Sequence, residues 1–307
     1  MAFDQARRRI AQAAKFRSKS LRFVSRDLLL LPPEISTLPS LQQLYLSNTQ
    51  VSDLTAISNL PGLRALNISN TQVRDLTPLA SLKNLRELRC SRTPVVNLQP
   101  IANLSSIRML ILNLTRVADL TPISGLIAIR TLGINFTPVT DLTPISAFAN
   151  LRELYMRDIP VGDLTQVQAF VTLKHLSLVG PHITDLSPVT KLIRLHSLVC
   201  ERTRVADITP IAALTQLTRL SLGDSPVRDI TPLVNLSGLR ELTLENTMVI
   251  DLSPVAELKA LETLIVDGTN VSELGPIRNL TNLKSVSVSG TRVLESFSAC
   301  RTHRAAE

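Results

Sequence analysis

The sequence contains no tryptophan, two tyrosines and seven phenylalanines among its 307 residues, so its apolar side chains are mainly those of Leu, Ile and Val. Aliphatic residues of this kind suit a stack of small, similar layers. No apolar run approaches the length of a membrane-spanning helix. The first residues, MAFDQARRRIAQAAK, carry cations but no apolar central region. We therefore expect neither a membrane span nor a secretory signal.

Cysteine is also scarce, because the chain has three, an odd number that does not suggest a disulfide framework. Cys90 and Cys200 stand where the equivalent residues are Leu, Ile, Met or Val, so both are predicted to point into the core. Cys300 is expected to be a free thiol. This cysteine usage favours a reducing compartment. We expect a cytoplasmic protein, and export as an effector stays open as an alternative.

Signatures of catalysis are missing as well. The chain has no G-x-x-x-x-G-K-[ST] phosphate loop, no G-x-G-x-x-G after a strand and no His/Cys spacing of the zinc type. Its four histidines are scattered along the sequence. We therefore expect a protein that is not an enzyme and that holds no cofactor or metal.

What the sequence has in abundance is one pattern, L-x-x-L-x-L-x-x-T-x-V-x-D-L-x-P-I-x-x-L-x-x, which begins at Leu41 and reopens at Leu283. Eleven complete units of 22 residues stand between these two leucines without an insertion or deletion. A fixed period of this length is typical of a solenoid, in which each unit needs its neighbours to bury its apolar face. The units are therefore predicted to share one core that grows along an axis.

Within a unit, L-x-x-L-x-L alternates inward and outward residues, which predicts a short strand. Successive strands run in the same direction and form a parallel sheet on the concave side. The segment DITPL at 229–233 is typical of the other side: Thr231 is expected to cap a helical turn and Pro232 to occupy its first position. Few residues follow before the next strand, so the sequence predicts a single 3₁₀ or α turn.

These units resemble bacterial leucine-rich repeats of the internalin-like, 22-residue class, which carry the same D-[LI]-[ST]-P-[LI] segment. The resemblance implies an α/β fold, namely a right-handed leucine-rich-repeat solenoid with a parallel concave sheet, and a role in recognition. One departure is systematic, because Thr occupies the ninth repeat position where that family usually has Asn. A Thr hydroxyl has fewer donors and acceptors than an Asn amide, so we expect it to supply only part of the bonds between neighbouring turns.

The start of the chain differs from the repeat. Residues 1–20 are predicted to form an amphipathic helix that caps the first layer. Contact with an anionic membrane and organelle targeting stay open as alternatives for this helix. Residues 21–40 are interpreted as an adaptor repeat, and their L-P-P-E-I segment resembles GTPase- and plant-type leucine-rich repeats.

The solenoid is assigned to residues 41–293, and residues 294–307 are assigned to a C-terminal tail without a clear cap. Phe297 is expected to fold back over the last layer. Otherwise the exposed valines of that layer leave self-association through the C-terminal end as an alternative. These valines are Val286, Val288 and Val293.

The net charge of +8 is concentrated at the start of the chain, where residues 1–22 hold seven cations against Asp4 alone. A solenoid that binds nucleic acid would normally carry its basic excess over the working face. We therefore expect no specific nucleic-acid partner.

Two rows of charge repeat along the stack. Aspartate at the thirteenth repeat position is interpreted as local turn chemistry, because Asp bonds readily to a backbone N–H two residues on. Cations at the second position lie on the opposite edge, where they either keep the edge solvated or steer an acidic partner. The aspartates are Asp53, Asp75, Asp119, Asp141, Asp163, Asp185, Asp207, Asp229 and Asp251, and the cations are Arg64, Arg86, Arg108, Arg130, Arg152, Lys174, His196, Arg240 and Lys284.

Outward positions of the concave sheet vary between units, and the middle units carry an apolar centre with charged residues around it. That composition is typical of a protein-binding surface. The repeat pattern is also broken in this region, which often marks a functional site. The predicted partner-binding residues are Met109, Ile111, Leu114, Phe136, Tyr155 and Val179 in the centre, with Arg89, Arg92, Arg157, Asp158 and Arg202 around them.

The sequence thus predicts a non-catalytic scaffold that binds a partner protein on its concave face. Two alternatives stay open. One is a sensor or regulatory subunit of a GTPase or another signalling system whose catalytic chain is separate. The other is the recognition part of a bacterial effector.

Overall fold

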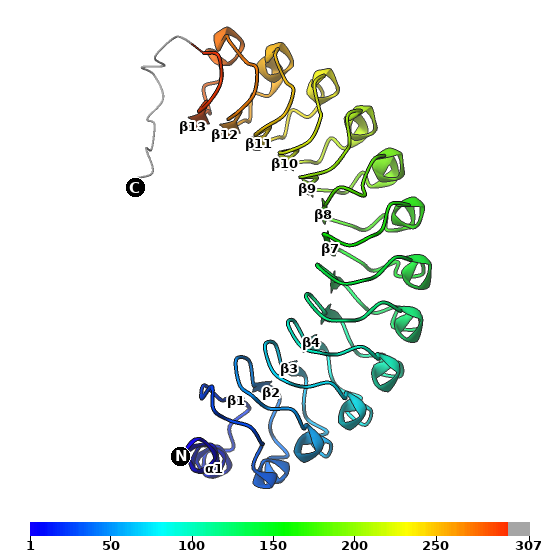
Figure 1. Ribbon diagram of the computed structural model, residues 1–307, viewed down its shortest axis with the longest axis vertical. Helices are drawn as coiled ribbons and strands as arrows, with labels where there is room; N and C mark the ends of the chain where they lie inside the picture. Colours follow the sequence, from blue (N-terminus) through cyan, green and yellow to red (C-terminus); the bar gives the residue numbers. More distant parts are fainter. Residues whose placement is uncertain (294–307) are drawn as a thin grey trace. The chain divides into compact units, whose positions relative to one another are not determined.

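The computed structural model describes residues 1–293. The chain divides into two compact units, Met1–Leu151 (unit 1) and Arg152–Glu307 (unit 2). In each unit short strands alternate with 3₁₀ turns, and the strands lie on the concave side while the turns lie on the convex side (Figure 1). The predictions made for Phe297 and Cys300 fall outside the described residues.

Unit 1 begins with helix α1 (Ala2–Lys15), which buries Ala6, Ile10 and Ala13 and lies against β1 and the first 3₁₀ turn. Within the unit, neighbouring strands pair in parallel and in chain order. The strands are β1 Ser20–Arg22, β2 Gln43–Tyr45, β3 Ala65–Asn67, β4 Glu87–Arg89, β5 Met109–Ile111 and β6 Thr131–Gly133.

Unit 2 repeats this arrangement, and its described strands again pair in parallel in chain order. The first two are longer than the others, with five residues each. The strands are β7 Glu153–Arg157, β8 His175–Val179, β9 Ser197–Val199, β10 Arg219–Ser221, β11 Glu241–Thr243, β12 Thr263–Ile265 and β13 Ser285–Ser287.

Between successive strands the described chain forms a 3₁₀ turn in every repeat, so the predicted helical turn takes its tighter form. Few residues are available there, and a short segment favours this geometry. The turns are η1 Pro33–Thr37, η2 Thr55–Ile57, η3 Thr77–Leu79, η4 Gln99–Ile101, η5 Thr121–Ile123, η6 Thr143–Ile145, η7 Thr165–Ala169, η8 Ser187–Lys191, η9 Thr209–Ala213, η10 Thr231–Leu233, η11 Ser253–Glu257 and η12 Gly275–Ile277.

Each layer sends the same set of apolar positions into the core. In the layer that starts at Leu85 these residues are Leu85, Leu88, Cys90, Val95, Leu98, Ile101 and Leu104, none of them more than 1% exposed. The predictions that Cys90 and Cys200 point inward are confirmed. Burial raises the pKa of both thiols, that of Cys200 to about 12, so both stay protonated and unreactive at neutral pH.

The buried threonines at the ninth position bond differently from the expectation. The Thr71 hydroxyl donates to the Ile68 carbonyl at 2.6 Å, three residues earlier in its own layer. Adjacent layers are joined at this level by the backbone instead, since the Gln72 N–H donates to the Val51 carbonyl at 2.9 Å. The expectation that Thr would link neighbouring turns is therefore wrong, because its short side chain bonds within its own turn.

The aspartates at the thirteenth position organise the 3₁₀ turns. Asp229 Oδ1 accepts the Thr231 N–H at 2.8 Å, and at Asp53 the hydroxyl of Thr55 also donates, at 2.6 Å. Ile230 stands at the N-cap position of this turn, and the aspartate before it supplies the side-chain bond. The expectations that Thr231 caps the turn and that Pro232 is its first residue are therefore wrong, because Thr231 is the first residue of the turn and Pro232 the second. The interpretation of the Asp row as turn chemistry is confirmed by these bonds.

The same bonds predict a stability that is sensitive to acid. Hydroxyl and backbone N–H donors of the following Thr or Ser hold the pKa of the carboxyl below its usual value at Asp53, Asp119, Asp141, Asp163, Asp207, Asp229 and Asp251. A carboxyl whose pKa is lowered by folding stabilises the fold at pH values above its pKa in the unfolded chain, which is about 3.9. This stabilisation is lost as the pH falls through the lower pKa of the folded state. The Tm measured by circular dichroism should therefore drop between about pH 5 and about pH 3.

Asparagine at these seven positions provides the matched control. Asn97 Oδ1 already accepts the equivalent bond from the Gln99 N–H at 2.8 Å, so the turns should be retained. Because an amide does not titrate, the Tm of this variant should fall less over the same range. An equal fall in both proteins would contradict the role assigned to the carboxylates.

Candidate functional site

Apolar side chains gather around strands β5 and β6 of unit 1. Met109 and Ile111 lie half-buried on β5, while Leu114 and Phe136, in the loops after β5 and β6, are each 43% exposed. The two loops are adjacent, because the Leu114 N–H donates to the Asn135 carbonyl at 2.8 Å. We call Met109, Ile111, Leu114 and Phe136 the apolar cluster.

Leu114 and Phe136 hold a backbone conformation that disfavours large side chains. Their φ angles of 58° and 55° lie in the left-handed region that Gly and Asn adopt most readily. Asn48 and Asn70 occupy the equivalent positions of two earlier layers, where Asn70 Nδ2 donates to Asn48 Oδ1 at 2.8 Å. A large apolar residue gives up that bond and adds strain of about 1–2 kcal/mol. Exposed residues kept at such positions indicate a role other than stability.

Gly133 of β6 leaves room for the side chain of Ile111 in the apolar cluster. A Cβ atom at residue 133 would lie 3.2 Å from Ile111 Cδ1 and 2.9 Å from Asn113 Oδ1. The Asn113 oxygen is itself engaged, since it accepts the Asn135 N–H at 2.9 Å. Any larger residue at this position would have to displace these groups, so glycine keeps the surface of the cluster in its observed form.

Two of the predicted charged residues border the cluster. Arg89 of β4 stands in register with Ile111 of β5, and Arg92 holds the left-handed position one layer before Leu114, with a φ of 55°. Both side chains are exposed, and within residues 1–293 neither makes an ion pair. Their guanidinium groups are thus free to meet a partner.

The predicted site residues of unit 2 are arranged differently. Tyr155 is half-buried on β7, and its hydroxyl donates to Glu153 Oε2 at 3.2 Å. Desolvation, together with the Glu153 carboxylate, raises the pKa of Tyr155 above its usual value. The ring is thus partly covered, and its polar end is tied to its own strand.

Two ion pairs of unit 2 each reach across an intervening layer. Arg157 Nη2 lies 3.4 Å from Glu201 Oε2, and Arg202 Nη1 lies 3.1 Å from Asp158 Oδ2. Each pair joins residues 44 positions apart, which is two repeats. Opposite charges at the same repeat position two periods apart are a signal in the sequence that would have predicted these pairs.

The prediction that Val179 contributes contact surface is wrong, because this side chain is only 2% exposed. Val179 stands in register with Arg157, in the layer across which Arg157 and Glu201 pair. Glu201 also accepts the hydroxyl of Ser221 at 2.6 Å. The structure thus pairs the predicted rim residues Arg157, Asp158 and Arg202 with other residues of this chain. Sequence reasoning placed Glu201 at the same rim but did not find its bonds to Arg157 and Ser221.

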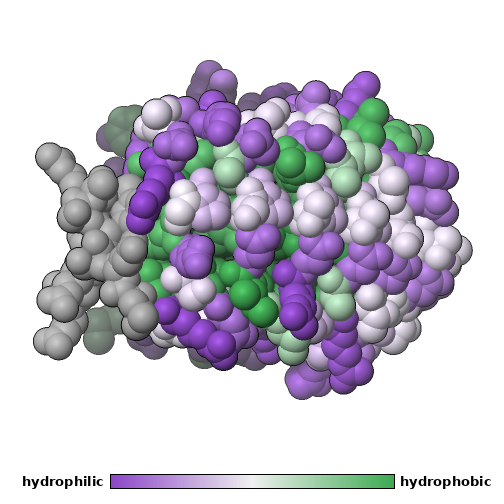
Figure 2. Space-filling model, turned by 90° about the horizontal axis from the view of Figure 1, so that it is seen from above, coloured by the Kyte–Doolittle hydropathy of each residue, from purple (hydrophilic) through white to green (hydrophobic). Residues whose placement is uncertain are grey.

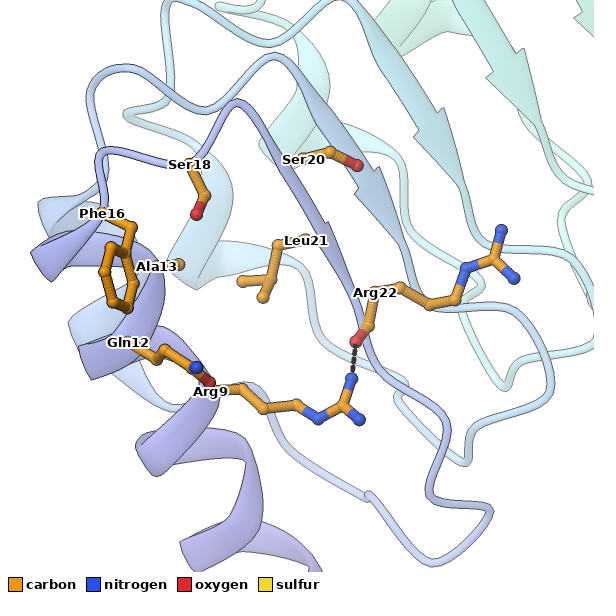
Figure 3. A pocket seen from close by; sticks show the side chains of 8 residues that line it. All are labelled: Arg9, Gln12, Ala13, Phe16, Ser18, Ser20, Leu21 and Arg22. Atoms are coloured by element: carbon orange, nitrogen blue, oxygen red, sulfur yellow. Dashed lines mark hydrogen bonds between the residues drawn. The ribbon is translucent and has the colours of Figure 1, made fainter.

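A pocket of about 520 Å³ lies between α1 and β1 (Figure 3). Arg9 extends along it and donates from Nη1 to the carbonyl of Arg22 at 2.6 Å, while the Arg22 side chain points away from the helix. Ala13 and Leu21 line its inner part. Because its single inward guanidinium already bonds to backbone, we assign these groups to holding the helix over the first layer.

The other surfaces give weaker indications of a binding site. Seen from above Figure 1, the molecule is largely hydrophilic, and apolar side chains show in several separate places (Figure 2). In the part of the chain that the structure describes, no group of three or more His, Cys, Asp or Glu side chains is placed to hold a metal ion. No helix among the described residues has both the length and the apolar character to cross a membrane. Val286, Val288 and Val293 are half-buried, and self-association through them stays a prediction.

Known proteins resemble this chain at several levels. The model of a family described as Leucine Rich repeats (2 copies) matches residues 39–81. No curated protein sequence matches the chain. Among solved structures, an internalin (inlF) from Listeria monocytogenes has 26% identity and a TM-score of 0.85, over 95% of this chain and 90% of that one.

Two further structures share the fold at lower identity. A leucine-rich-repeat protein of Leptospira interrogans has 22% identity and a TM-score of 0.58, over 84% of this chain and 81% of that one. The ectodomain of the plant receptor kinase GASSHO1/SCHENGEN3 from Arabidopsis thaliana, in complex with Casparian strip integrity factor 2, has 16% identity and a TM-score of 0.69. That match covers 89% of this chain and 35% of the receptor.

The repeat pattern, the architecture and these likenesses agree. Parallel strands alternate with 3₁₀ turns in both units, a helix precedes the first strand, and threonines are buried at the ninth position. The internalin match extends over nearly the whole length of both chains. The predicted fold is therefore confirmed: the chain is a leucine-rich-repeat solenoid, and its fold matches that of the Listeria internalin.

Proposed function

We propose that this protein is a non-catalytic scaffold that binds a partner protein through the concave side of unit 1. The observation that carries the proposal is the exposure of Leu114 and Phe136, at 43% each, in left-handed backbone that suits smaller residues. Apolar and aromatic anchors beside arginines are the usual composition of binding hot spots. Arg89 and Arg92 supply the arginines here.

The fold supports the same proposal. A solenoid offers a long concave surface whose outward side chains vary while the core positions stay fixed. The plant receptor ectodomain of the same fold was solved with a bound factor, which supports a protein or peptide as the class of partner. Unit 2 is assigned a smaller share of the binding, because Arg157, Asp158 and Arg202 are already paired.

Site-specific photo-crosslinking tests which side binds. A photoreactive amino acid is introduced either at Ala65 of β3, on the strand side, or at Ser124, which is exposed just after turn η5. Each protein is irradiated in native lysate, and the crosslinked species are identified by mass spectrometry. We expect one protein to be captured from the position of Ala65 and not from that of Ser124. Capture from Ser124 alone would contradict the assignment to the concave side.

A further inference from the structure

Four arginines of unit 1 follow the edge at which the chain enters its strands. Arg64, Arg86, Arg108 and Arg130 are all exposed, and we call them the arginine stripe. The backbone N–H groups of the last three each donate to the carbonyl of the preceding arginine, at 2.8, 2.8 and 2.7 Å. The four residues thus occupy consecutive layers, about 4.8 Å apart along the stack.

Unit 1 does not neutralise this stripe. Within the described chain, none of the four side chains makes an ion pair or a hydrogen bond. Glu87 follows Arg86 in the sequence, but it too is exposed and makes no ion pair with a described residue. Like charges side by side on a sheet repel each other and lower its stability. The stripe therefore does not add to the stability of the fold.

The equivalent row in unit 2 shows that the repeat does not require arginine there. Glu262 lies between Arg240 and Lys284, 3.0 Å from Arg240 Nη1 and 2.5 Å from Lys284 Nζ. Lys284, with a smaller effect of Arg240, holds the pKa of the Glu262 carboxyl below its usual value. His196 and Thr218 fill two other positions of the row. Neutral and acidic residues thus fit this edge, although unit 2 opens the row with two further cations, Arg152 and Lys174.

We propose that the arginine stripe binds an acidic polypeptide segment of the partner. This inference rests on the proposed function and names the chemistry of one part of the partner. A guanidinium binds a carboxylate through two parallel N–H···O bonds, which suits arginine better than lysine. The stripe spans about 14 Å, a distance that about five residues of extended chain cover. Two or three Asp or Glu residues in such a segment would neutralise it.

The neighbourhood of the stripe favours a peptide over a nucleic acid. The next residues along the strands are Ala65, Glu87, Met109 and Thr131. They provide no aromatic ring on which a base could stack. Arg108 also directly precedes Met109 of the apolar cluster, so a protein that covers the cluster lies close to the stripe.

Fluorescence anisotropy with labelled hexaglutamate tests the proposal on the full chain. The test variant replaces all four arginines of the stripe by glutamine. The wild type should bind the peptide, and its affinity should fall as the salt concentration rises. The variant should bind at least about tenfold more weakly. Its Tm should be unchanged or raised, because mutual repulsion has been removed.

The matched control replaces Arg204, Arg228, Arg240 and Lys284 of unit 2 by glutamine, which removes the same number of charges outside the run of cations from Arg64 to Lys174. This control should keep the wild-type affinity. Equal losses in the two variants, no binding of hexaglutamate by the wild type, or tighter binding of oligothymidylate would each overturn the proposal. The probe does not require the partner, so failure here is distinguishable from failure of the crosslinking test.

Discussion

Replacing Leu114 and Phe136 together by asparagine should weaken binding of the partner protein by about 2–4 kcal/mol without destabilising unit 1. Both side chains are 43% exposed, so their removal leaves no cavity in the core. Asparagine is well suited to the left-handed backbone of these positions. It can also bond along the row, as Asn70 Nδ2 does to Asn48 Oδ1 at 2.8 Å. The variant therefore separates recognition from folding.

Isothermal titration calorimetry with the purified partner measures this effect as a rise in Kd of about 30- to 900-fold. Thermal melts followed by circular dichroism report the stability. Met248 and Ile250 of unit 2, 55% and 48% exposed, provide a control pair whose replacement by asparagine should leave the Kd unchanged. Wild-type affinity of the Leu114/Phe136 variant would exclude the apolar cluster as the binding site.

Much of the fold follows from the sequence because the period fixes which residues share a layer. Once Leu41 and Leu63 are aligned, every inward position is defined, and even Cys90 is placed in the core by its repeat position alone. The short strands follow from the alternation of apolar residues, and the single turns follow from the small number of residues between one strand and the next. The hydrogen bonds of the buried threonines join groups of the same turn. They depend on the backbone geometry of that turn, which the repeat pattern does not specify.

Val179 shows where the same reasoning fails for the site. Its repeat position faces outward, and a single repeat gives no reason to expect burial. Val179 lies in the layer between those of Arg157 and Glu201, whose side chains pair across two repeats. Reading one layer at a time cannot find such pairs. Comparing charges two periods apart would have found both this pair and the one between Asp158 and Arg202.

The left-handed backbone at the eighth position was also missed, although a signal for it exists. The residues at that position that favour this conformation are Asn48, Asn70, Asp158, Gly180, Asp224, Asn246, Gly268 and Gly290. Arg92, Leu114 and Phe136 depart from this composition in three consecutive layers of unit 1, and Arg202 departs from it in a single layer of unit 2. This departure is the strongest argument for function in unit 1. It can be recognised only once the eighth position is known to need a left-handed backbone conformation.

Leu176→Asp should unfold the layers around β8, with a loss of about 4–5 kcal/mol or more. Leu176 is 2% exposed and stands in register with Leu154 of β7 and Leu198 of β9. An aspartate in this place would be a buried carboxylate without a partner, which must either take up a proton or open the fold. Each layer of a solenoid is stabilised by its two neighbours, so the damage spreads to both sides.

Ser177→Asp is the matched control, because it introduces the same charge one residue further along, where the strand directs the side chain to the opposite face. Ser177 is half-buried, and this substitution should cost less than about 1 kcal/mol. Urea titration followed by circular dichroism should show an early transition for Leu176→Asp that Ser177→Asp lacks. Inward residues are assigned to the stability of the stack, and outward residues to recognition of a partner. If both variants unfolded at the same urea concentration, this distinction would be wrong. The assignment of Leu114 and Phe136 to binding would then lose its physical basis.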